Sequence, residues 1–284
     1  SHKSDTTRNI GRFNNHIKAS LGSMKMDRIT VAHVQKLKDT LSKKISQRTK
    51  KLLARKSVDD ILNLINTIYL YFNRVSDIEL KSPANPKKVE RYNPDNARQR
   101  YLTHEEIKVL YWNIKNRSSF NPKAHFKQSV TDDLMMFTKL ALTTGARISS
   151  ILSIQVKDID FKNGVIQISN HKVGGRTYNG YFNDKLSTEL KTWCEPLSKD
   201  HYIIGKRTQA LDRMTINRRL QVILNRCFND GVDDVKYKVV IHTLRHTCFS
   251  LLAQKGVSLY IIQKLADHSR IENTQRYAKL SEYS

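Results

Sequence analysis

The first part of the chain contains two stretches in which apolar residues recur at steps of three and four. Within Ile29–Leu41, three such residues share one face: Val34, Leu37 and Leu41. A longer series follows Ser57: Val58, Ile61, Leu62, Ile65, Ile68, Tyr69, Phe72 and Val75. This spacing is typical of amphipathic helices. We therefore expect residues 1–80 to form a helical unit.

A break in the apolar pattern follows this unit. Residues 81–100 contain three prolines, several lysines and no apolar period. Such composition favours an extended, basic linker. Thr103 and Glu106 then have the spacing of a capping box at the start of a helix. The predicted organisation is a helical unit at 1–80, a linker at 81–100 and a second unit at 101–284.

The second unit is predicted to be rich in helices. One helix is expected from Asp132, capped by Thr131, and Thr144-Gly145 should end it. Its buried face is predicted to include Leu134, Met135, Phe137, Leu140 and Ala141. A short helix over 148–152 should follow, and further helices are expected at about 184–194, 215–229, 243–254 and 258–266.

Two short segments in the second unit alternate as strands do. Residues 164–169 alternate, and residues 178–182 can pair back on them across Lys172–Arg176, whose glycines permit a tight turn. The predicted fold is therefore mainly α: a helical N-terminal unit, followed by an α-rich unit with a small antiparallel β-sheet.

The charge of the chain points to a polyanionic partner. The net charge is +24, and it divides into +13 up to Arg100 and +11 after it. Basic surfaces of this kind bind nucleic acid by neutralising phosphates. The segment between the two N-terminal helices is a candidate contact to a DNA backbone, although such a run is also typical of a solvated face. Its basic residues are Lys43, Lys44, Arg48, Lys50, Lys51, Arg55 and Lys56.

Several protein classes are disfavoured. No apolar run is long enough to span a membrane, and neither a basic amphipathic anchor nor a secretory signal is evident. The odd set Cys194, Cys227 and Cys248 lacks paired spacing, which argues against a disulfide or zinc scaffold and fits a reducing compartment. We expect a cytoplasmic, nucleoid-associated protein. Because the chain begins with Ser1-His2, we expect residues upstream to be missing.

The last hundred residues carry a candidate reactive constellation. It comprises His242-x-x-Arg245-His246, then His268, then Tyr277 nine positions later. A guanidinium suits a phosphate, histidine can move a proton near neutral pH, and tyrosine can act as a covalent nucleophile. Together they indicate phosphoryl transfer that needs no metal and no cofactor.

With the segment 144–149 (Thr-Gly-Ala-Arg-Ile-Ser) and Lys172 on the hairpin, this constellation resembles the tyrosine recombinase (phage integrase) family. The resemblance covers nearly the whole chain, and it implies that the helical N-terminal unit is a core-binding domain and that the α-rich unit with the small sheet is a catalytic domain. It is strongest to prophage-type integrases, and Xer-type recombinases come next. It implies a site-specific recombinase that cleaves and rejoins DNA strands through a 3′-phosphotyrosyl intermediate, for integration or excision of a mobile element. It further implies a homotetramer on double-stranded DNA with a specific recombination site, with accessory DNA-bending proteins as further possible partners.

The resemblance also implies a role for each catalytic residue. Tyr277 would attack the scissile phosphate, while Arg147 and Arg245 would clamp its non-bridging oxygens. His242 would accept the phenol proton or hold a phosphate oxygen, and His268 would add a hydrogen bond to that oxygen. Lys172 would protonate the leaving 5′-oxygen.

Two positions depart from the family pattern. Ser150 stands where an acidic residue commonly follows the first arginine, so a brace to that arginine is either weaker or supplied from elsewhere. Asp267 stands before the last histidine, where glycine is usual. It would either tune His268 toward its charged form or face solvent.

Simpler interpretations exist for several residues. Taken alone, Arg147 would be a surface residue after a turn, and Arg176 shares the hairpin with Lys172. His246 has the spacing of a metal pair with His242 but lacks the His-Glu-x-x-His pattern, so we interpret it as a core histidine or a support to the site. Tyr260 and Tyr283 are rival nucleophiles.

Three other functions stay open at this point. Xer-like resolution of chromosome dimers uses the same chemistry, as does a type IB topoisomerase, which would relax plasmids without a particular site. A DNA-binding protein with a decayed active site is the non-enzymatic alternative. The intact set of six catalytic residues argues against decay.

Overall fold

The computed structural model describes residues 2–47, 49–94, 100–116, 127–170, 175–205 and 208–281. Arg48, Lys172 and Tyr283 lie outside the described residues. The chain divides into two compact units, 1–96 and 97–284. Within the described residues, no helix is both long and apolar enough to cross a membrane.

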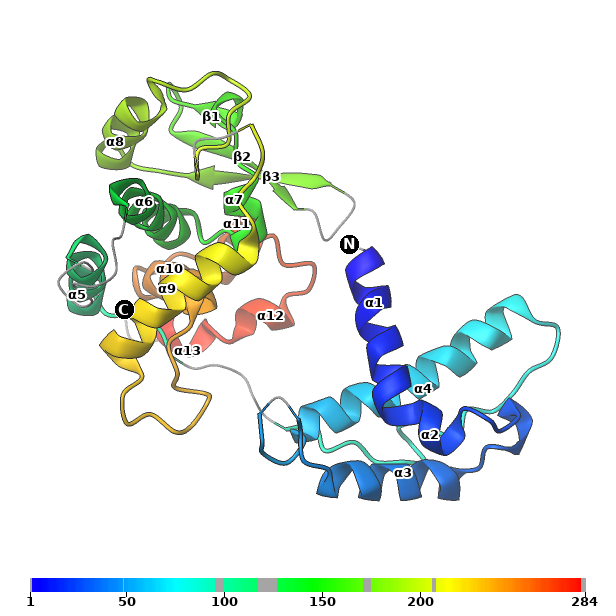
Figure 1. Ribbon diagram of the computed structural model, residues 1–284. Coiled ribbons are helices and arrows are strands. Elements are labelled where there is room, and N and C mark those ends of the chain that lie inside the picture. The colour runs from blue at the N-terminus through cyan, green and yellow to red at the C-terminus, as the bar shows by residue number, and fades with distance from the viewer. Residues whose placement is uncertain are drawn as a thin grey trace. The chain divides into compact units, whose positions relative to one another are not determined.

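The first unit is helical (Figure 1). Its elements are α1 (His2–Arg12), the π-helical turn Phe13–Ile17, α2 (Lys18–Leu21), the 3₁₀ turn Met26–Arg28, α3 (Val31–Lys43) and α4 (Arg55–Val75). Thr30 caps α3 by accepting from the backbone N–H of His33. Most residues of the apolar faces predicted for α3 and α4 form one core. Ile68 and Phe72 are half-buried and do not belong to it, and Val75, at the end of α4, is exposed.

The segment predicted as a linker begins with residues that pack onto this core. Ala84 and Val89 are buried, and Arg91 donates from Nε to Asn63 Oδ1 at 2.9 Å. The buried carboxylate of Asp59 on α4 accepts from two backbone N–H groups, those of Tyr92 and Asn93, each at 2.9 Å. Small apolar residues between the prolines therefore allow residues 81–94 to join the first unit rather than extend from it.

The second unit is mainly helical and contains a small sheet (Figure 1). Its helices are α5 (His104–Lys115), α6 (Gln128–Thr144), α7 (Ile148–Leu152), α8 (Asp184–Cys194), α9 (Arg213–Phe228), α10 (Ile241–Gln254), α11 (Leu259–Leu265), α12 (Glu272–Gln275) and α13 (Ala278–Ser281), and a 3₁₀ turn covers Val156–Asp158. The strands β1 (Ile159–Asp160), β2 (Val165–Asn170) and β3 (Arg176–Tyr181) form an antiparallel sheet in that order. The structure confirms the predicted fold class.

Helix α6 differs from its prediction at its start. It begins at Gln128, so Thr131 lies inside the helix rather than capping it. Val130 already packs against the core, so the buried face starts one turn before Leu134. Met136 is buried in this face, whereas Met135 is only partly covered.

We predict that Asp59→Ala destabilises the first unit by about 2–4 kcal/mol, because two partly buried backbone donors would lose their acceptor. The amides of Tyr92 and Asn93 should lose protection in hydrogen exchange, which places the loss at this contact. The exposed Asp39 on α3 provides the control, since Asp39→Ala should change stability by no more than about 0.5 kcal/mol. Unchanged exchange at the two amides in Asp59→Ala would contradict the prediction.

Candidate active site

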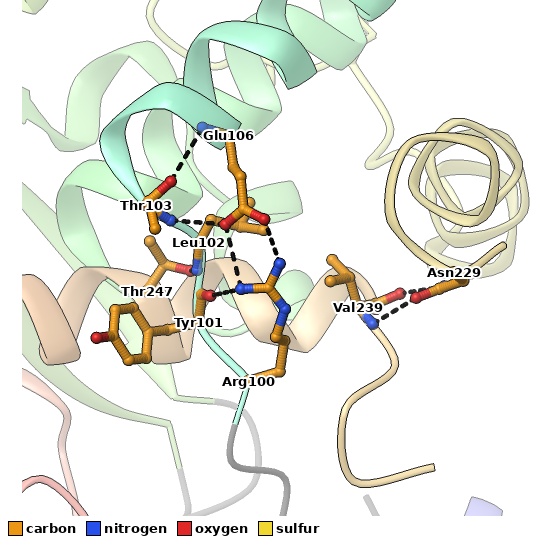
Figure 2. Close-up of polar contacts among 8 residues, drawn as sticks. All are labelled: Arg100, Tyr101, Leu102, Thr103, Glu106, Asn229, Val239 and Thr247. Atoms are coloured by element: carbon orange, nitrogen blue, oxygen red, sulfur yellow. Dashed lines mark hydrogen bonds and ion pairs between the residues drawn. The ribbon is translucent and has the colours of Figure 1, made fainter. Parts of the chain in front are cut away.

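Helix α10 presents the residues of the His-x-x-Arg-His motif, and its position is fixed by the chain that enters the second unit. Leu102 donates its backbone N–H to Thr247 Oγ1 at 2.9 Å, and Thr247 lies on α10 (Figure 2). Arg100 contacts both carboxylate oxygens of Glu106, which caps α5 together with Thr103 (Figure 2). This network ties the start of the unit to the middle of α10.

The N-terminal approach to α10 is held by a second set of bonds. Asn229 accepts from the backbone N–H of Val239 at 2.7 Å and donates to its carbonyl at 2.8 Å (Figure 2). Both backbone groups of Val239 are thereby satisfied before the helix begins at Ile241. Residues His242, Arg245 and His246 then share one helical face, because they are three and four positions apart.

The turn after α6 brings Arg147 to this face. Gly145 has φ +63°, in the left-handed region that favours glycine. A Cβ at this position would lie 2.4 Å from Cζ of Phe249. Arg245 donates from Nη1 to the Gly145 carbonyl at 2.6 Å. Only glycine therefore permits this close turn, which places Arg147 two residues from a carbonyl that binds Arg245.

Arg245 is held almost entirely inside the protein. Its side chain is 4% exposed, and besides the Gly145 carbonyl it donates to the carbonyl of Ala266, which follows α11. Burial lowers the pKa of its guanidinium, and the positive charge of Arg147 lowers it further. Two guanidiniums held close together form a site that suits an anion, because an anion removes their mutual repulsion.

Arg147 has an unsatisfied donor at this site. Its Nη1 atom is buried and has no hydrogen-bond partner, although the Asp267 carboxylate lies 3.7 Å away as an ion pair. A buried donor without an acceptor costs free energy. The arginine pair therefore offers unused N–H groups to an acceptor such as a phosphate oxygen.

The ring of Phe249 packs beside three of the candidate residues. Its ring centroid is 5.0 Å from the guanidinium carbon of Arg245, 6.3 Å from the ring of His268 and 6.0 Å from that of Tyr277. Sequence reasoning did not identify this residue, although it lies four positions after Arg245, on the same helical face. Its fully buried ring supports side chains from three separate segments.

His268 is part of the same cluster and is held in its neutral form. Its Nδ1 atom lies 2.9 Å from Thr274 Oγ1. Burial and the positive charges of Arg245, Arg147 and Arg276 lower its pKa to about 4, and Asp267 opposes this shift only weakly. Asp267 favours the charged form of His268, as expected, but burial and three cations outweigh its effect. The alternative that Asp267 faces solvent is wrong, because its side chain is 3% exposed.

Tyr277 lies between α12 and α13 and is 3% exposed. Its hydroxyl is 2.9 Å from His246 Nδ1, and His246 Nε2 is 3.3 Å from Nη1 of Arg276. Since arginine can only donate, Nε2 must accept, and the imidazole proton must therefore be on Nδ1. His246 thus donates to the phenol oxygen in this state. It is a support to the site, as one of our two interpretations held, and its partner is Tyr277 itself.

Burial raises the pKa of Tyr277 to about 12, although the charges of Arg276 and Arg245 oppose the rise.

His242 is exposed on α10, and its ring packs edge-on against that of His246, with the ring centroids 4.8 Å apart. The rival Tyr260 is 61% exposed on α11, and Lys264 Nζ lies over its ring at 4.4 Å. The structure thus brings Arg147, Arg245, His268 and Tyr277 together.

The predicted DNA-contacting residues lie in the first unit, except that Arg48 is outside the described residues. The other six are exposed: Lys43, Lys44, Lys50, Lys51, Arg55 and Lys56. They lie in the connection between α3 and α4 or at the adjoining ends of these helices, and a β-bridge between Ile45 and Leu52 closes the connection. Lys44 donates to the Asn15 carbonyl, and Lys56 pairs with Asp60 at 3.3 Å.

Because burial and nearby arginines lower the pKa of His268 to about 4, this pKa should change when the charge at the site changes. A phosphate bound between Arg147 and Arg245 would offset their charges, so the pKa of His268 should rise when a short DNA duplex binds. We expect an NMR titration of the His268 ring to show this upward shift, with His268→Gln identifying the resonance. A value near 6.5 in the free protein would contradict the description of the site.

The same pKa predicts how stability depends on pH. The folded value lies below the unfolded value of 6.5, so the unfolded state binds more protons between these values. This contribution to stability is present above pH 6.5 and is lost as the pH falls toward 4. His268→Gln should therefore flatten the acid side of the profile obtained by urea unfolding.

Two regions of the chain match known domains. Residues 100–283 match the phage integrase family, and residues 7–42 match the N-terminal SAM-like domain of phage integrases. A probable integrase/recombinase of Acholeplasma phage L2 is 26% identical over 233 residues, which are 80% of this chain and 71% of that protein. Tyrosine recombinase XerC of Staphylococcus aureus is 25% identical over 237 residues, 81% of this chain and 72% of that protein.

Solved structures share the fold. The integrase of the Tn1549 transposon, in complex with transposon right-end DNA, superposes with a TM-score of 0.70 at 16% identity, covering 96% of this chain and 88% of that chain. A λ integrase dimer bound to a core site also gives 0.70 at 16% identity, covering 99% and 90%. Because the family match alone spans well over half of the sequence, this chain belongs to the phage integrase family.

Proposed function

We propose that this protein is a site-specific DNA recombinase that cleaves and rejoins DNA strands through a 3′-phosphotyrosyl intermediate. The observation that carries the proposal is the cluster of Arg245, His268 and Tyr277 around Phe249, with Arg147 close to Arg245. These residues come from segments spread over 130 positions of the sequence. Family membership supports the same reaction class.

The arginine pair is the proposed phosphate clamp. Arg245 is fixed by two backbone carbonyls, so its guanidinium needs little reorganisation when a phosphate arrives. Arg147 supplies the buried Nη1 donor that has no hydrogen-bond partner. His268, neutral at pH 7, can donate one hydrogen bond to the same oxygen without adding another charge. The clamp would stabilise the charge that develops on the non-bridging oxygens.

The proposed reaction transfers one phosphodiester bond. The Tyr277 oxygen bonds to phosphorus, the bond from phosphorus to the 5′-oxygen breaks, and Lys172 gives a proton to that oxygen. His242 takes the phenol proton or holds a phosphate oxygen. The reverse reaction with a 5′-hydroxyl from another strand releases Tyr277 and completes the exchange. The bond energy is conserved, so no nucleotide cofactor is needed.

Attack requires the nucleophile to leave its position in this structure. Tyr277 is 3% exposed and accepts a hydrogen bond from His246, so phosphorus cannot reach it there. The segment that carries it consists of two helices of four residues each, α12 and α13. Short helices of this kind have little stability of their own. We propose that DNA binding and assembly shift this segment toward the arginine clamp.

Double-stranded DNA with a specific recombination site is the proposed partner. Structural neighbours are integrases and recombinases in complex with DNA. We propose that the exposed lysines of the first unit neutralise backbone phosphates, which would give binding a steep salt dependence. Exchange between two duplexes needs four cleavages, so we propose a homotetramer on DNA. Accessory DNA-bending proteins would position the partner sites.

Integration or excision of a mobile element is the proposed role, and resolution of chromosome dimers is the second candidate. The relatives support both, since a phage integrase and XerC match with similar identity. Cleavage at the junction sequences of an element would favour the first role, and cleavage at a chromosomal resolution site the second. Relaxation of any supercoiled plasmid would instead indicate a type IB topoisomerase.

We predict that Tyr277→Phe abolishes covalent attachment to DNA. Wild-type protein should form a denaturant-resistant adduct on a nicked suicide substrate that carries the cognate site, and Tyr277→Phe should form none, because the attacking oxygen is gone. Tyr260→Phe is the matched control and should retain the adduct, since this exposed tyrosine lies outside the cluster. An adduct that persists in Tyr277→Phe would assign the nucleophile to another residue.

We predict that Lys172→Ala slows cleavage about 10²–10⁴-fold, the usual range for loss of a general acid. A substrate with sulfur in place of the leaving 5′-oxygen should restore the rate, because a thiolate leaves without protonation. Arg176→Ala is the control on the same hairpin, and sulfur should not rescue it, since a guanidinium does not give up its proton. Equal slow rates on both substrates in Lys172→Ala would move the acid role to another group.

A further inference from the structure

Asp267 is a buried carboxylate that the reaction scheme does not use. Its side chain is 3% exposed, and its backbone has φ +47°, in the left-handed region. Residues other than glycine are uncommon there, although aspartate and asparagine tolerate it. A carboxylate kept at such a position, and kept out of solvent, must be held by its contacts.

The first group of contacts ties Asp267 to the β2–β3 hairpin. Asn170 donates from Nδ2 to one carboxylate oxygen, and Nε of Arg176 lies 3.3 Å from the other. Asn170 and Arg176 face each other across the two strands, as the last residue of β2 and the first of β3. The carboxylate therefore binds the base of the connection 171–174, in which Lys172 lies.

The second contact ties Asp267 to the arginine clamp. Arg147 Nη1 lies 3.7 Å from Oδ2, the same oxygen that accepts from Asn170. The position at which an acid would commonly brace this arginine is Ser150, which is buried and carries no charge. Among the described residues, Asp267 is the acid that forms an ion pair with Arg147.

Asp267 also adjoins two further parts of the site along the chain. The carbonyl before it, that of Ala266, accepts from Arg245, and the residue after it is His268. One short segment thus contacts Arg245 through its backbone and Arg147 through its side chain. Movement of Asp267 would displace both arginines relative to His268 and the hairpin.

We propose that Asp267 is a positioning residue of the active site, whose carboxylate holds Arg147 and the base of the β2–β3 hairpin in place beside His268. It supplies from a different position in the sequence the brace that an acid at position 150 would provide. The proposal rests on the proposed function, because it concerns the rate of the cleavage step. Asp267 does not touch the phosphate and acts only through Arg147 and the hairpin.

The test compares two substitutions at the same position. Asp267→Asn keeps the shape of the side chain and tolerates the left-handed backbone but removes the charge. Asp267→Gly removes the side chain and relieves the backbone. We expect either change to slow single-turnover adduct formation on a nicked substrate by about 10–100-fold, since a small displacement of a positioned group costs up to about 10² in rate. The DNA dissociation constant should change by less than about threefold.

Double-mutant cycles separate positioning from general stability. In an Arg147→Lys background, Asp267→Asn should cost clearly less than it does in the wild type, because the group it positions is already altered. Additive losses would overturn the proposal, as would a slower rate that merely follows a lower melting temperature. Adding Ser150→Glu to Asp267→Gly returns an acid to the alternative position and should recover part of the lost rate.

The outcomes also distinguish this inference from the proposed function. If wild-type protein forms no adduct on cognate sites, the proposed function fails and the role of Asp267 fails with it. If the wild type cleaves and Asp267→Gly cleaves at the same rate, only the inference fails. Should Ser150→Glu prevent folding, the cycle with Arg147→Lys still decides the question.

Discussion

The candidate active site depends on one buried guanidinium. Arg245 on α10 donates to the carbonyl of Gly145 after α6 and to that of Ala266 after α11. These two bonds join α10 to two other segments, which lie 100 and 21 residues away from Arg245 in the sequence. Removing a charge from water is costly unless it is well bonded, and here backbone oxygens with no charge of their own do the bonding. The positive charge of Arg245 therefore stays available to an anionic ligand.

The other features of the site follow from that retained charge. Arg147 and Arg245 together create a local excess of positive charge. The neutral state of His268 and the ion pair of Arg147 with the buried Asp267 carboxylate both follow from that excess. Gly145 and Phe249 are the steric counterpart, since the turn can approach α10 only where no Cβ intervenes. Electrostatics and packing thus select the same arrangement, a small cationic site lined by one aromatic ring.

Much of this could be predicted from sequence, for identifiable reasons. Apolar periods of three and four located α3 and α4, and most helices of the second unit were also expected from sequence. The start of α6 was missed, because Val130 joins the core through contacts with distant residues. The packing of Ala84 and Val89 was missed for the same reason. The environments of Asp267 and His246 also depend on partners that are distant in the sequence, and no local pattern reports such contacts.

The buried position of Tyr277 bears on how readily its phenol could react with DNA that is not the target. With a pKa of about 12, roughly one phenol in 10⁵ is ionised at neutral pH, a hundredfold fewer than for a tyrosine in water. Under the proposed function, the resting molecule would be a latent enzyme whose nucleophile is covered by its own chain and almost wholly un-ionised. Strand breakage would then be confined to complexes in which a bound target displaces that cover.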